Sequence, residues 1–323
     1  MKVLVTGANG FVGQAVCRRL LNDGHDVVAA VRRDIDLPAG AVPVRVGSID
    51  ARTSWAQHLD GVQAIVHLAA RVHVMQDKAA DPLAEFRAVN TAATLHLAHE
   101  AVRAGVPHLV YMSTIKVNGE ESDHPYSGAD TPNPQDPYGQ SKAEAESGLA
   151  DLAAASSLKV TVLRPPLVYG PRVGGNFRAL LKLISKSLPL PLGAIRNSRS
   201  LVYVENLADA VAASLTMTPG ACEIFTISDG EDVSTAQLIS RLADKLEKPA
   251  RLLMVPVWIL ALLGKVTGKS AAIRRLTGSL RVDNSAFCLR TGWRPPFTLD
   301  QGLAATAEWF KREQTRPPAR AGQ

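Results

Sequence analysis

Short apolar stretches alternate with amphipathic stretches along the first half of the chain. Lys2–Thr6 is the first apolar stretch, and Phe11–Asn22 has the apolar spacing of a helix that Gly24 closes. The same alternation predicts strands at Asp26–Val31, Val42–Val46, Ala64–Leu68, His108–Ser113 and Lys159–Arg164, and helices at Leu83–Ala104 and Pro137–Ala155. Continuously apolar strands separated by helices are typical of a parallel sheet covered on both faces. We therefore expect a doubly wound α/β fold whose ligand lies at the carboxyl ends of the strands.

The second half of the chain has a less regular pattern, and we expect it to form a smaller C-terminal α/β lobe that binds the substrate. The pattern predicts helices at Asn176–Ser187, Val204–Met217, Ser234–Glu247 and Asp300–Arg312, and strands at Ser200–Tyr203 and Glu223–Ile227. The predicted division is a first domain at residues 1–165, the smaller lobe at 166–313 with some elements returning to the main sheet, and a disordered tail at 314–323.

The longest apolar run, Leu252–Leu263, is interrupted by Pro256 and is shorter than the roughly 20 residues that cross a bilayer. We expect a buried or interfacial helix there, with contact to a membrane surface as the alternative. The first residues lack the apolar core of a signal peptide. These features predict a cytoplasmic protein without stable membrane insertion, with a peripheral position at the inner membrane left open.

Composition narrows the class of protein only slightly. The 323 residues are 46% hydrophobic and 20% charged, so the chain can bury a substantial core. The net charge of +6 is too diffuse to indicate a nucleic-acid partner without a motif. Cys17, Cys222 and Cys288 are odd in number and far apart, which predicts no disulfide framework and no metal site.

The first strand runs into a glycine turn that opens a helix. Gly7, Gly10 and Gly13 permit, in that order, a tight turn, a close approach of the backbone to a pyrophosphate, and close packing of helix on sheet. The helix N-terminus supplies free N–H groups and a partial positive charge for phosphates. In this context the pattern predicts a Rossmann-type dinucleotide site.

The residue after the second strand distinguishes NAD from NADP. An acidic residue there binds the ribose 2′-hydroxyl, whereas an arginine accommodates a 2′-phosphate. Here Arg32 and Arg33 follow the strand, which favours NADP(H). In the alternative, which keeps NAD(H) open, Arg32 stacks on the adenine while Asp34 or Asp36 binds the ribose.

Tyr138 and Lys142 form a Tyr-x-x-x-Lys motif on a predicted helix, where the spacing of four residues places both side chains on one face. A tyrosine of ordinary pKa, near 10, exchanges protons poorly at neutral pH. We expect the ammonium of Lys142, together with an oxidised nicotinamide, to lower the pKa of Tyr138. The pair is therefore a candidate acid/base centre.

Hydroxyl side chains end the fifth predicted strand, at Ser113 and Thr114. One of them can hold a substrate oxygen beside Tyr138, while the other only caps the strand end. His67 follows the fourth strand, and we expect it to be structural at the cofactor rather than a general base.

Taken together, these residues resemble the extended short-chain dehydrogenase/reductase superfamily, which includes the NAD-dependent epimerase/dehydratase family. The segments that carry the resemblance are Thr6–Gly13, His67–Ala70, Asn90-Thr91, Arg164–Pro171, and Asp283 with Thr291–Pro295. The resemblance implies cofactor contacts at Gly7, Gly10, Phe11, Val12, Gly13, Arg32, Ile49, Leu68, Ala69, Ala70, Tyr138, Lys142 and Pro165.

Within that superfamily the chain looks most similar to enzymes of nucleotide-sugar metabolism. The resemblance then makes Thr114, Tyr138 and Lys142 the catalytic residues. It implies substrate contacts, with a UDP-linked sugar as the partner, at Ser113, Thr114, Lys116, Tyr138, Asn176, Phe177 and Arg199. From Arg164 to Arg199 the sequence has seven cations and no acid, which also favours an anionic substrate. We expect most of these cations to lie on a solvated surface, with Arg199 as the functional one.

Departures from the family patterns favour one member of the group. Ile115 and Lys116 stand where 4,6-dehydratases have an acidic pair, and Arg32 stands where 4-epimerases usually have an acid. The segment Ser113–Gly119 has Asn118 where Val-Tyr-Gly is usual, and it resembles reductases of UDP-4-keto-6-deoxy-N-acetylhexosamines in surface-polysaccharide synthesis. The leading hypothesis is therefore an NADPH-dependent reductase of the sugar C4 ketone.

Three other functions stay open at this point. The first is a UDP-hexose 4-epimerase, acting on UDP-glucose or UDP-N-acetylglucosamine with retained NAD. The second is a reductase of apolar carbonyl compounds. The third, from a different class, is a non-catalytic NADPH-sensing module. The family resemblance also suggests a homodimer.

Overall fold

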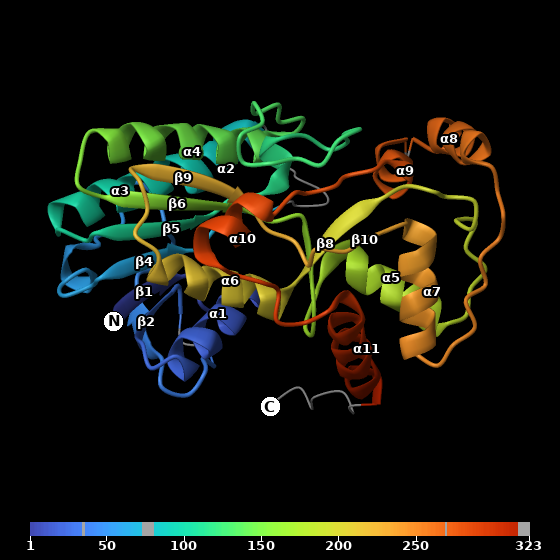
Figure 1. The fold of residues 1–323 in the computed structure, drawn as a ribbon, viewed down its shortest axis with the longest axis horizontal. Helices are drawn as coiled ribbons and strands as arrows, with labels where there is room; N and C mark the ends of the chain where they lie inside the picture. The colour runs from blue at the N-terminus through green and yellow to red at the C-terminus, as the bar shows by residue number, and fades with distance from the viewer. Residues whose placement is uncertain (34–35, 73–80, 269, 316–323) are drawn as a thin grey trace.

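The computed structural model describes residues 1–33, 36–72, 81–268 and 270–315. A seven-stranded sheet forms the core of its larger part, and all of its neighbouring strands run parallel (Figure 1). The strand order is β3-β2-β1-β4-β5-β6-β9. The strands are β1 (Lys2–Thr6), β2 (Asp26–Val31), β3 (Val42–Arg45), β4 (Ala64–His67), β5 (His108–Met112), β6 (Lys159–Arg164) and β9 (Cys222–Thr226). This order reverses direction between β1 and β4, and the predicted doubly wound, Rossmann-type fold is confirmed.

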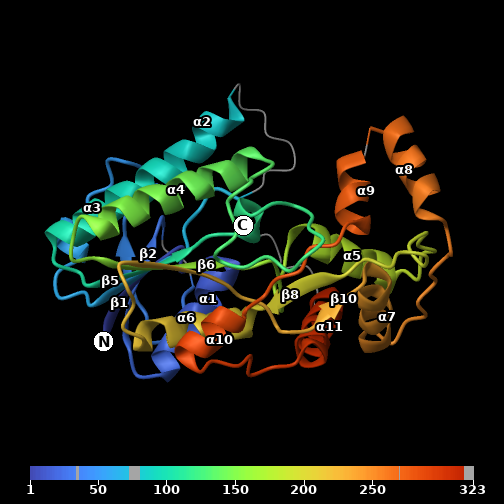
Figure 2. The same cartoon turned by 45° about the horizontal axis from the view of Figure 1, so that its top comes forward.

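Helices cover both faces of this sheet, and the alternation of side chains along the strands explains why. Val3 and Val5 of β1 join one core cluster, whereas Leu4 joins the other. Figures 1 and 2 show α1 and α6 on one face and α2, α3 and α4 on the opposite face. The helices are α1 (Phe11–Asn22), α2 (Pro82–Phe86), α3 (Ala93–Arg103), α4 (Pro137–Ala154) and α6 (Val204–Thr216), with short 3-10 turns η1 (Ala56–His58) and η3 (Ile115–Val117).

The predicted helix at Leu83–Ala104 is one helical run that changes its hydrogen-bonding pattern in the middle. Between α2 and α3, the segment η2 (Arg87–Ala92) is a π-helix. Such segments are frequent at functional sites. Asn90 of η2 is fully buried, and its amide contacts both the Arg71 backbone and Ser141 of α4. The altered helix therefore fixes α4 relative to the end of β4.

The smaller lobe contains a three-stranded sheet in the order β10-β8-β7. Its elements are β7 (Leu167–Tyr169), α5 (Gly175–Ser185), β8 (Arg199–Tyr203), β10 (Asp232–Val233), α7 (Thr235–Lys245), α8 (Val257–Val266), α9 (Ser270–Thr277), α10 (Ser285–Thr291) and α11 (Leu299–Thr315). β9 returns to the main sheet beside β6, and α6 packs on α1. The division at residue 165 stays a prediction, since both elements lie beyond it.

Two expectations for the smaller lobe can be compared with the structure. The apolar run is helical only from Val257, after Pro256, and Trp258 and Leu262 on α8 are 68% and 55% exposed. Of the expected buried or interfacial helix at Leu252–Leu263, the buried form is therefore excluded, and the interfacial form stays a prediction. α11 continues to Thr315, so Gln314 and Thr315 are helical and do not belong to a disordered tail, and residues 316–323 lie outside the described residues. Within the described part of the chain, no helix is long and apolar enough to cross a membrane.

Candidate active site

The glycine turn after β1 is packed so closely that side chains would not fit. Gly7 has a φ of +67°, and a Cβ on it would lie 2.8 Å from the backbone nitrogen of Ala69. A Cβ on Gly13 would lie 2.1 Å from the carbonyl oxygen of Gly7. The hydroxyl of Thr6 accepts hydrogen bonds from the backbone N–H groups of Leu68 and Ala69, both at 3.2 Å. The turn and the end of β4 are therefore one rigid unit.

The N-terminus of α1 fits a diphosphate. Gly10 is the N-cap, it has no side chain to occupy the first N–H groups, and the first turn contains no acidic residue. The exposed N–H groups and the helix dipole favour an anion there. Other residues predicted to contact the cofactor are half-buried around this turn: Phe11, Val12, Leu68, Ala69 and Ala70.

The other residues that are predicted to contact the cofactor lie at or beyond the ends of β2, β3 and β6. Arg32 is exposed immediately after β2, and Ile49 is half-buried beyond β3 against the core. Asp36 is exposed, and Asp34 lies outside the described residues. Pro165 is buried, and its carbonyl accepts a hydrogen bond of 3.0 Å from the N–H of Ile115.

His67 at the end of β4 is a structural residue, as predicted. Its Nδ1 lies 2.7 Å from the hydroxyl of Thr6, and its Nε2 lies 2.9 Å from the hydroxyl of Thr94. Burial, and secondarily the charge of Lys142, lowers the pKa of His67 to about 3. The neutral ring thus joins β1, β4 and α3, and both of its nitrogens are engaged.

α4 brings Tyr138 and Lys142 to the carboxyl end of β5. Asp136 caps the helix by accepting a hydrogen bond of 2.7 Å from the N–H of Gly139, and Pro137 occupies the first turn. The side chain of Thr114 lies close enough to Tyr138 to oppose the rise of its pKa. Nζ of Lys142 donates to the carbonyl of Met112 at 2.8 Å. The three predicted catalytic residues therefore lie together.

The electrostatics of this cluster differ from the expectation. Burial raises the pKa of Tyr138 to about 12, Asp136 adds to this, and the Thr114 hydrogen bond opposes it. Burial lowers the pKa of Lys142 to about 7, although Glu146 opposes that shift. Lys142 is not among the groups that shift the pKa of Tyr138. Its Nζ binds the Met112 carbonyl and is itself desolvated. With its pKa raised, Tyr138 carries its proton at neutral pH and can donate it.

Only one of the two strand-end hydroxyls faces the tyrosine. The hydroxyl of Ser113 donates instead to the carboxylate of Glu146. Glu146 also binds Arg164, whose Nε lies 3.0 and 3.1 Å from its two oxygens, and Nη1 of Arg164 donates to Asn118 at 3.0 Å. The hydroxyl of Ser113 therefore belongs to a buried polar network, and its contact with a substrate stays a prediction.

Glu146 and Arg164 are structural residues of the site that the sequence did not indicate. Their side chains are 4% and 1% exposed, so Arg164 does not belong to a solvated basic surface. The spacing could have placed Glu146 at the site, because it lies four residues after Lys142 and therefore on the same face of the helix. Nothing in the sequence pairs it with Arg164, eighteen residues away.

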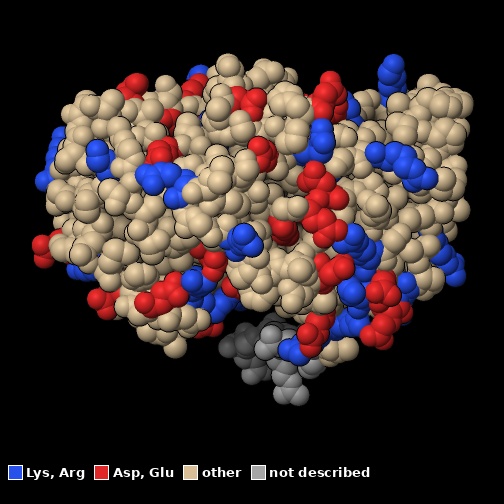
Figure 3. Space-filling model, viewed as in Figure 1, with Lys and Arg blue, Asp and Glu red and all other residues tan. Residues whose placement is uncertain are grey.

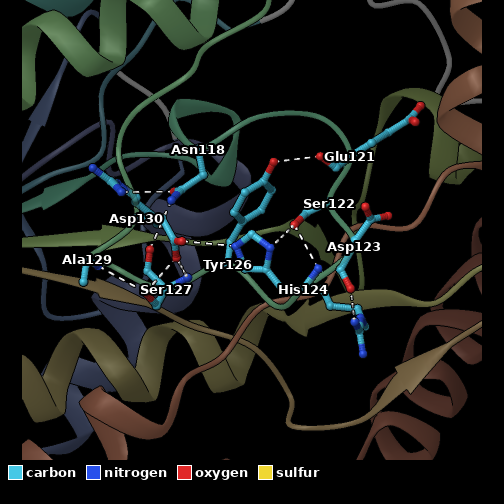
Figure 4. Close-up of polar contacts among 11 residues, drawn as sticks. Asn118, Glu121, Ser122, Asp123, His124, Tyr126, Ser127, Ala129 and Asp130 are labelled. Carbon is cyan, nitrogen blue, oxygen red and sulfur yellow. Dashed lines mark hydrogen bonds and ion pairs between the residues drawn. The ribbon is translucent and has the colours of Figure 1, made fainter.

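The loop from Asn118 to Asp130 lies between η3 and α4 along the chain and contacts the smaller lobe (Figure 4). Nδ2 of Asn118 donates to the carbonyl of Ser127 at 3.1 Å, and Asp130 accepts from the N–H and hydroxyl of Ser127 at 2.6 and 2.7 Å. The N–H of Tyr126 donates to the carbonyl of Arg281 at 2.9 Å. The loop is therefore held at both ends.

Lys116 precedes this loop and is engaged by carboxylates. Its Nζ lies 3.1 Å from Glu120, and it also forms an ion pair with Asp136, the cap of α4. The ammonium thus joins α4 to the loop, and a contact of Lys116 with the substrate stays a prediction.

The residues of the smaller lobe that are expected to contact the substrate lie in different environments. Arg199 is half-buried at the start of β8, and its Nη1 donates to the carbonyls of Arg275 and Gly278 at 3.0 and 2.9 Å. Burial lowers the pKa of Arg199, whereas the charges of Glu121 and Glu120, in the loop from Asn118 to Asp130, oppose that shift. The described residues include no carboxylate within ion-pair distance of Arg199.

Of the two residues at the start of α5, Asn176 lies on the surface and Phe177 lies in the core. Asn176 is exposed in the first turn of the helix. Phe177 is 3% exposed, and its ring stacks on Tyr169 with 5.6 Å between the centroids. The side chain of Phe177 is thus a core residue, and only its backbone can meet a ligand.

Comparison with known proteins supplies independent information on this site. The model of the NAD dependent epimerase/dehydratase family matches residues 3–227. A UDP-glucose 4-epimerase of Vibrio cholerae is 43% identical over 318 residues, which cover 97% of this chain and 97% of that protein. An N-acetyl-alpha-D-glucosaminyl-diphospho-ditrans,octacis-undecaprenol 4-epimerase of Escherichia coli O157:H7 is 27% identical over 329 residues, covering 95% and 94%.

Solved structures show the same fold over the whole chain. The structure of MoeE5 in complex with UDP-glucose and NAD is 26% identical, with a TM-score of 0.78 over 98% of this chain and 100% of that chain. The Bordetella bronchiseptica enzyme WbmG in complex with NAD has a TM-score of 0.75 over 97% of this chain and 94% of that chain. At 21% identity, the latter likeness bears on the fold alone.

Proposed function

Because the chain belongs to the NAD-dependent epimerase/dehydratase family and is an enzyme of nucleotide-sugar metabolism, we propose that it is a UDP-hexose 4-epimerase with retained NAD. The observation that carries the proposal is the meeting of Thr114, Tyr138 and Lys142 at the carboxyl end of β5, where Nζ of Lys142 binds the Met112 carbonyl. The 43% identity to a UDP-glucose 4-epimerase over nearly the whole chain supports it.

In the proposed reaction Tyr138 exchanges a proton with the C4 hydroxyl of the sugar. The phenolate form removes the hydroxyl proton as the C4–H bond breaks, and the phenol returns it when that bond forms again on the opposite face. Thr114 holds the oxygen that changes between alcohol and ketone. A bound NAD would supply the acceptance and return of the C4 hydride, so no external oxidant would be consumed. Burial disfavours the phenolate, so this step needs a cation near Tyr138, and Lys142 would supply it when its Nζ is protonated.

The residues that would hold the cofactor are those of the glycine turn. The backbone cradle at Gly7, Gly10 and Gly13 would receive the diphosphate at the α1 N-terminus. The segment Leu68–Ala70 borders the same cradle through the Thr6 hydroxyl. Which group recognises the ribose stays a prediction, and Arg32 is the exposed candidate after β2.

A second candidate function is reduction of a UDP-4-keto-6-deoxy sugar by NADPH. It is favoured by Arg32 and Arg33, which are both exposed directly after β2 where a 2′-phosphate would lie. The same Tyr138 would then act only as proton donor to the C4 oxygen, which agrees with its raised pKa. Epimerase and reductase differ in whether reduced cofactor is consumed.

One experiment separates the two candidates. Purified protein is incubated with UDP-glucose or UDP-N-acetylglucosamine without added cofactor, and the C4 epimer is followed by proton NMR. We expect equilibration of the two epimers and release of NAD from the denatured protein. If instead a UDP-4-keto-6-deoxy-N-acetylhexosamine drives stoichiometric loss of NADPH absorbance and neither UDP-hexose changes, the epimerase proposal is wrong and the reductase is established.

Arg199 provides a test of the substrate-binding site. Replacement of Arg199 by methionine is expected to raise the KM for the UDP-sugar by roughly 10- to 100-fold, the equivalent of one charge-assisted hydrogen bond. We expect kcat to change less, because Arg199 binds carbonyls of the smaller lobe and not the Tyr138 cluster. Steady-state kinetics at several substrate concentrations give both values.

Arg196 is the matched control, three residues earlier and exposed. It lines a cavity of about 640 Å³ with Gly193, Asn197 and Met254, apart from the Tyr138 cluster. Arg196→Met is expected to change KM by less than about threefold, as for an exposed charge. A larger change in KM from the Arg196 variant than from the Arg199 variant would indicate that the substrate binds in that cavity. It would contradict the assignment of Arg199 as a substrate-binding residue.

A further inference from the structure

α8 is apolar around its whole circumference but packs on the protein along one side only. Leu260 and Gly264, four residues apart, are its buried positions. On the opposite side Trp258, Leu262 and Val266, at the same spacing, are 68%, 55% and 78% exposed. A helix that is apolar on all sides is normally enclosed by protein or lipid. The outward stripe of α8 therefore has no covering element among the described residues.

The exposed apolar surface extends beyond this stripe. We define the α8 patch as Met254, Val257, Trp258, Leu262, Leu263 and Val266, all of them exposed. In Figures 1 and 2, α8 and α9 lie at the outer edge of the smaller lobe, far from the seven-stranded sheet. α9 supports α8 from behind, because Ile273 packs against Gly264. The patch is thus carried on a folded helix pair.

The sequence around the patch carries only positive charge. Between Glu247 and Asp283 there is no acidic residue, and the seven cations are Lys248, Arg251, Lys265, Lys269, Arg274, Arg275 and Arg281. Lys265 on α8 and Arg274 on α9 are exposed. In Figure 3 the upper right corner, where α8 and α9 lie in Figure 1, shows tan and blue surface.

We propose that the α8 patch docks the protein on the surface of an anionic lipid bilayer. Exposed tryptophan and leucine side chains with flanking cations are the composition of a helix that lies in the membrane interface. α8 has 10 residues, so it is about 15 Å long and far too short to cross a hydrocarbon core of about 30 Å. A second copy of the chain fits the patch less well, because the two basic surroundings would repel each other.

The docked face is connected to the candidate substrate site. The carbonyls of Arg275 and Gly278, at and just beyond the end of α9, accept hydrogen bonds from Arg199. Docking through α8 would therefore hold the side of the protein that carries Arg199 close to the lipid surface.

Vesicle sedimentation with the full chain tests the proposal. We expect the protein to sediment with vesicles of equal parts phosphatidylglycerol and phosphatidylcholine, and to bind phosphatidylcholine alone weakly. Added salt should reduce the binding, since the electrostatic part is screened. The triple variant Trp258→Gln, Leu262→Gln, Val266→Gln should partition at least about tenfold less onto the mixed vesicles, because it loses the apolar surface.

The matched control also replaces three exposed apolar side chains, but outside the patch. The variant Val42→Gln, Leu183→Gln, Leu289→Gln changes residues that are 58%, 40% and 87% exposed, and it should bind like the unchanged protein. Equal melting temperatures would show that both variants fold. The proposal is overturned if the unchanged protein stays in the supernatant, or if both variants bind alike. It is also overturned if light scattering shows a dimer that only the α8 variant abolishes.

Discussion

Replacement of Tyr138 by phenylalanine is expected to lower kcat by about 100- to 10,000-fold, the usual contribution of one acid/base group. The Tyr138 hydroxyl is the group that exchanges a proton with the sugar C4 oxygen in both candidate reactions. We do not expect Thr114 to replace it, because the Thr114 hydroxyl oxygen already accepts a hydrogen bond from the N–H of Lys116. The ring itself would remain packed near Phe86, with 6.0 Å between the centroids.

The fold and the binding of ligands should survive this change. The KM for the UDP-sugar and the NAD content of the protein are expected to stay within about threefold, since the lost atom acts on the reaction step. Tyr126→Phe is the matched control, because it also removes a hydroxyl, one that donates to the carbonyl of Glu121 at 2.7 Å in the adjacent loop. Normal turnover by the Tyr138 variant would show that another group moves the proton.

The sequence was sufficient to predict the main sheet, and it was sufficient to predict that Tyr138 and Lys142 lie together, because both depend on local patterns. Apolar strands between amphipathic helices define the doubly wound fold, and the glycine turn is recognisable from its position after β1. Tyr138 and Lys142 share a helix face through their spacing alone. Such features need no knowledge of what packs against them.

The details that sequence analysis missed depend on contacts between distant segments. Ser113 and Thr114 are adjacent hydroxyls, and only the approach of Glu146 from α4 determines which one is free to meet Tyr138. Arg164 ends β6 within a basic segment, yet it is buried because Glu146 and Asn118 surround it. The exposure of α8 was equally hidden, since an apolar pattern does not show whether another element covers it.

The buried network leads to the second large prediction, which concerns stability. Glu146→Gln is expected to lower the free energy of unfolding by about 3–5 kcal/mol, the cost of leaving one partner of a buried ion pair without the other. Arg164 would keep its hydrogen bond to Asn118 but lose the carboxylate that binds its Nε and Nη2. Ser113 would lose its charged acceptor as well. Urea unfolding followed by circular dichroism measures the difference.

Glu144→Gln, two residues earlier on α4, is the control for this prediction. Glu144 pairs with Arg87 at 2.6 Å, but the two side chains are 31% and 46% exposed, so water compensates for the lost pair. We expect a change of about 0–1 kcal/mol. Equal effects of the two substitutions would mean that burial does not distinguish the pairs. The Glu146–Arg164 pair would then not be the feature that holds the strand end of Thr114 against the helix of Tyr138.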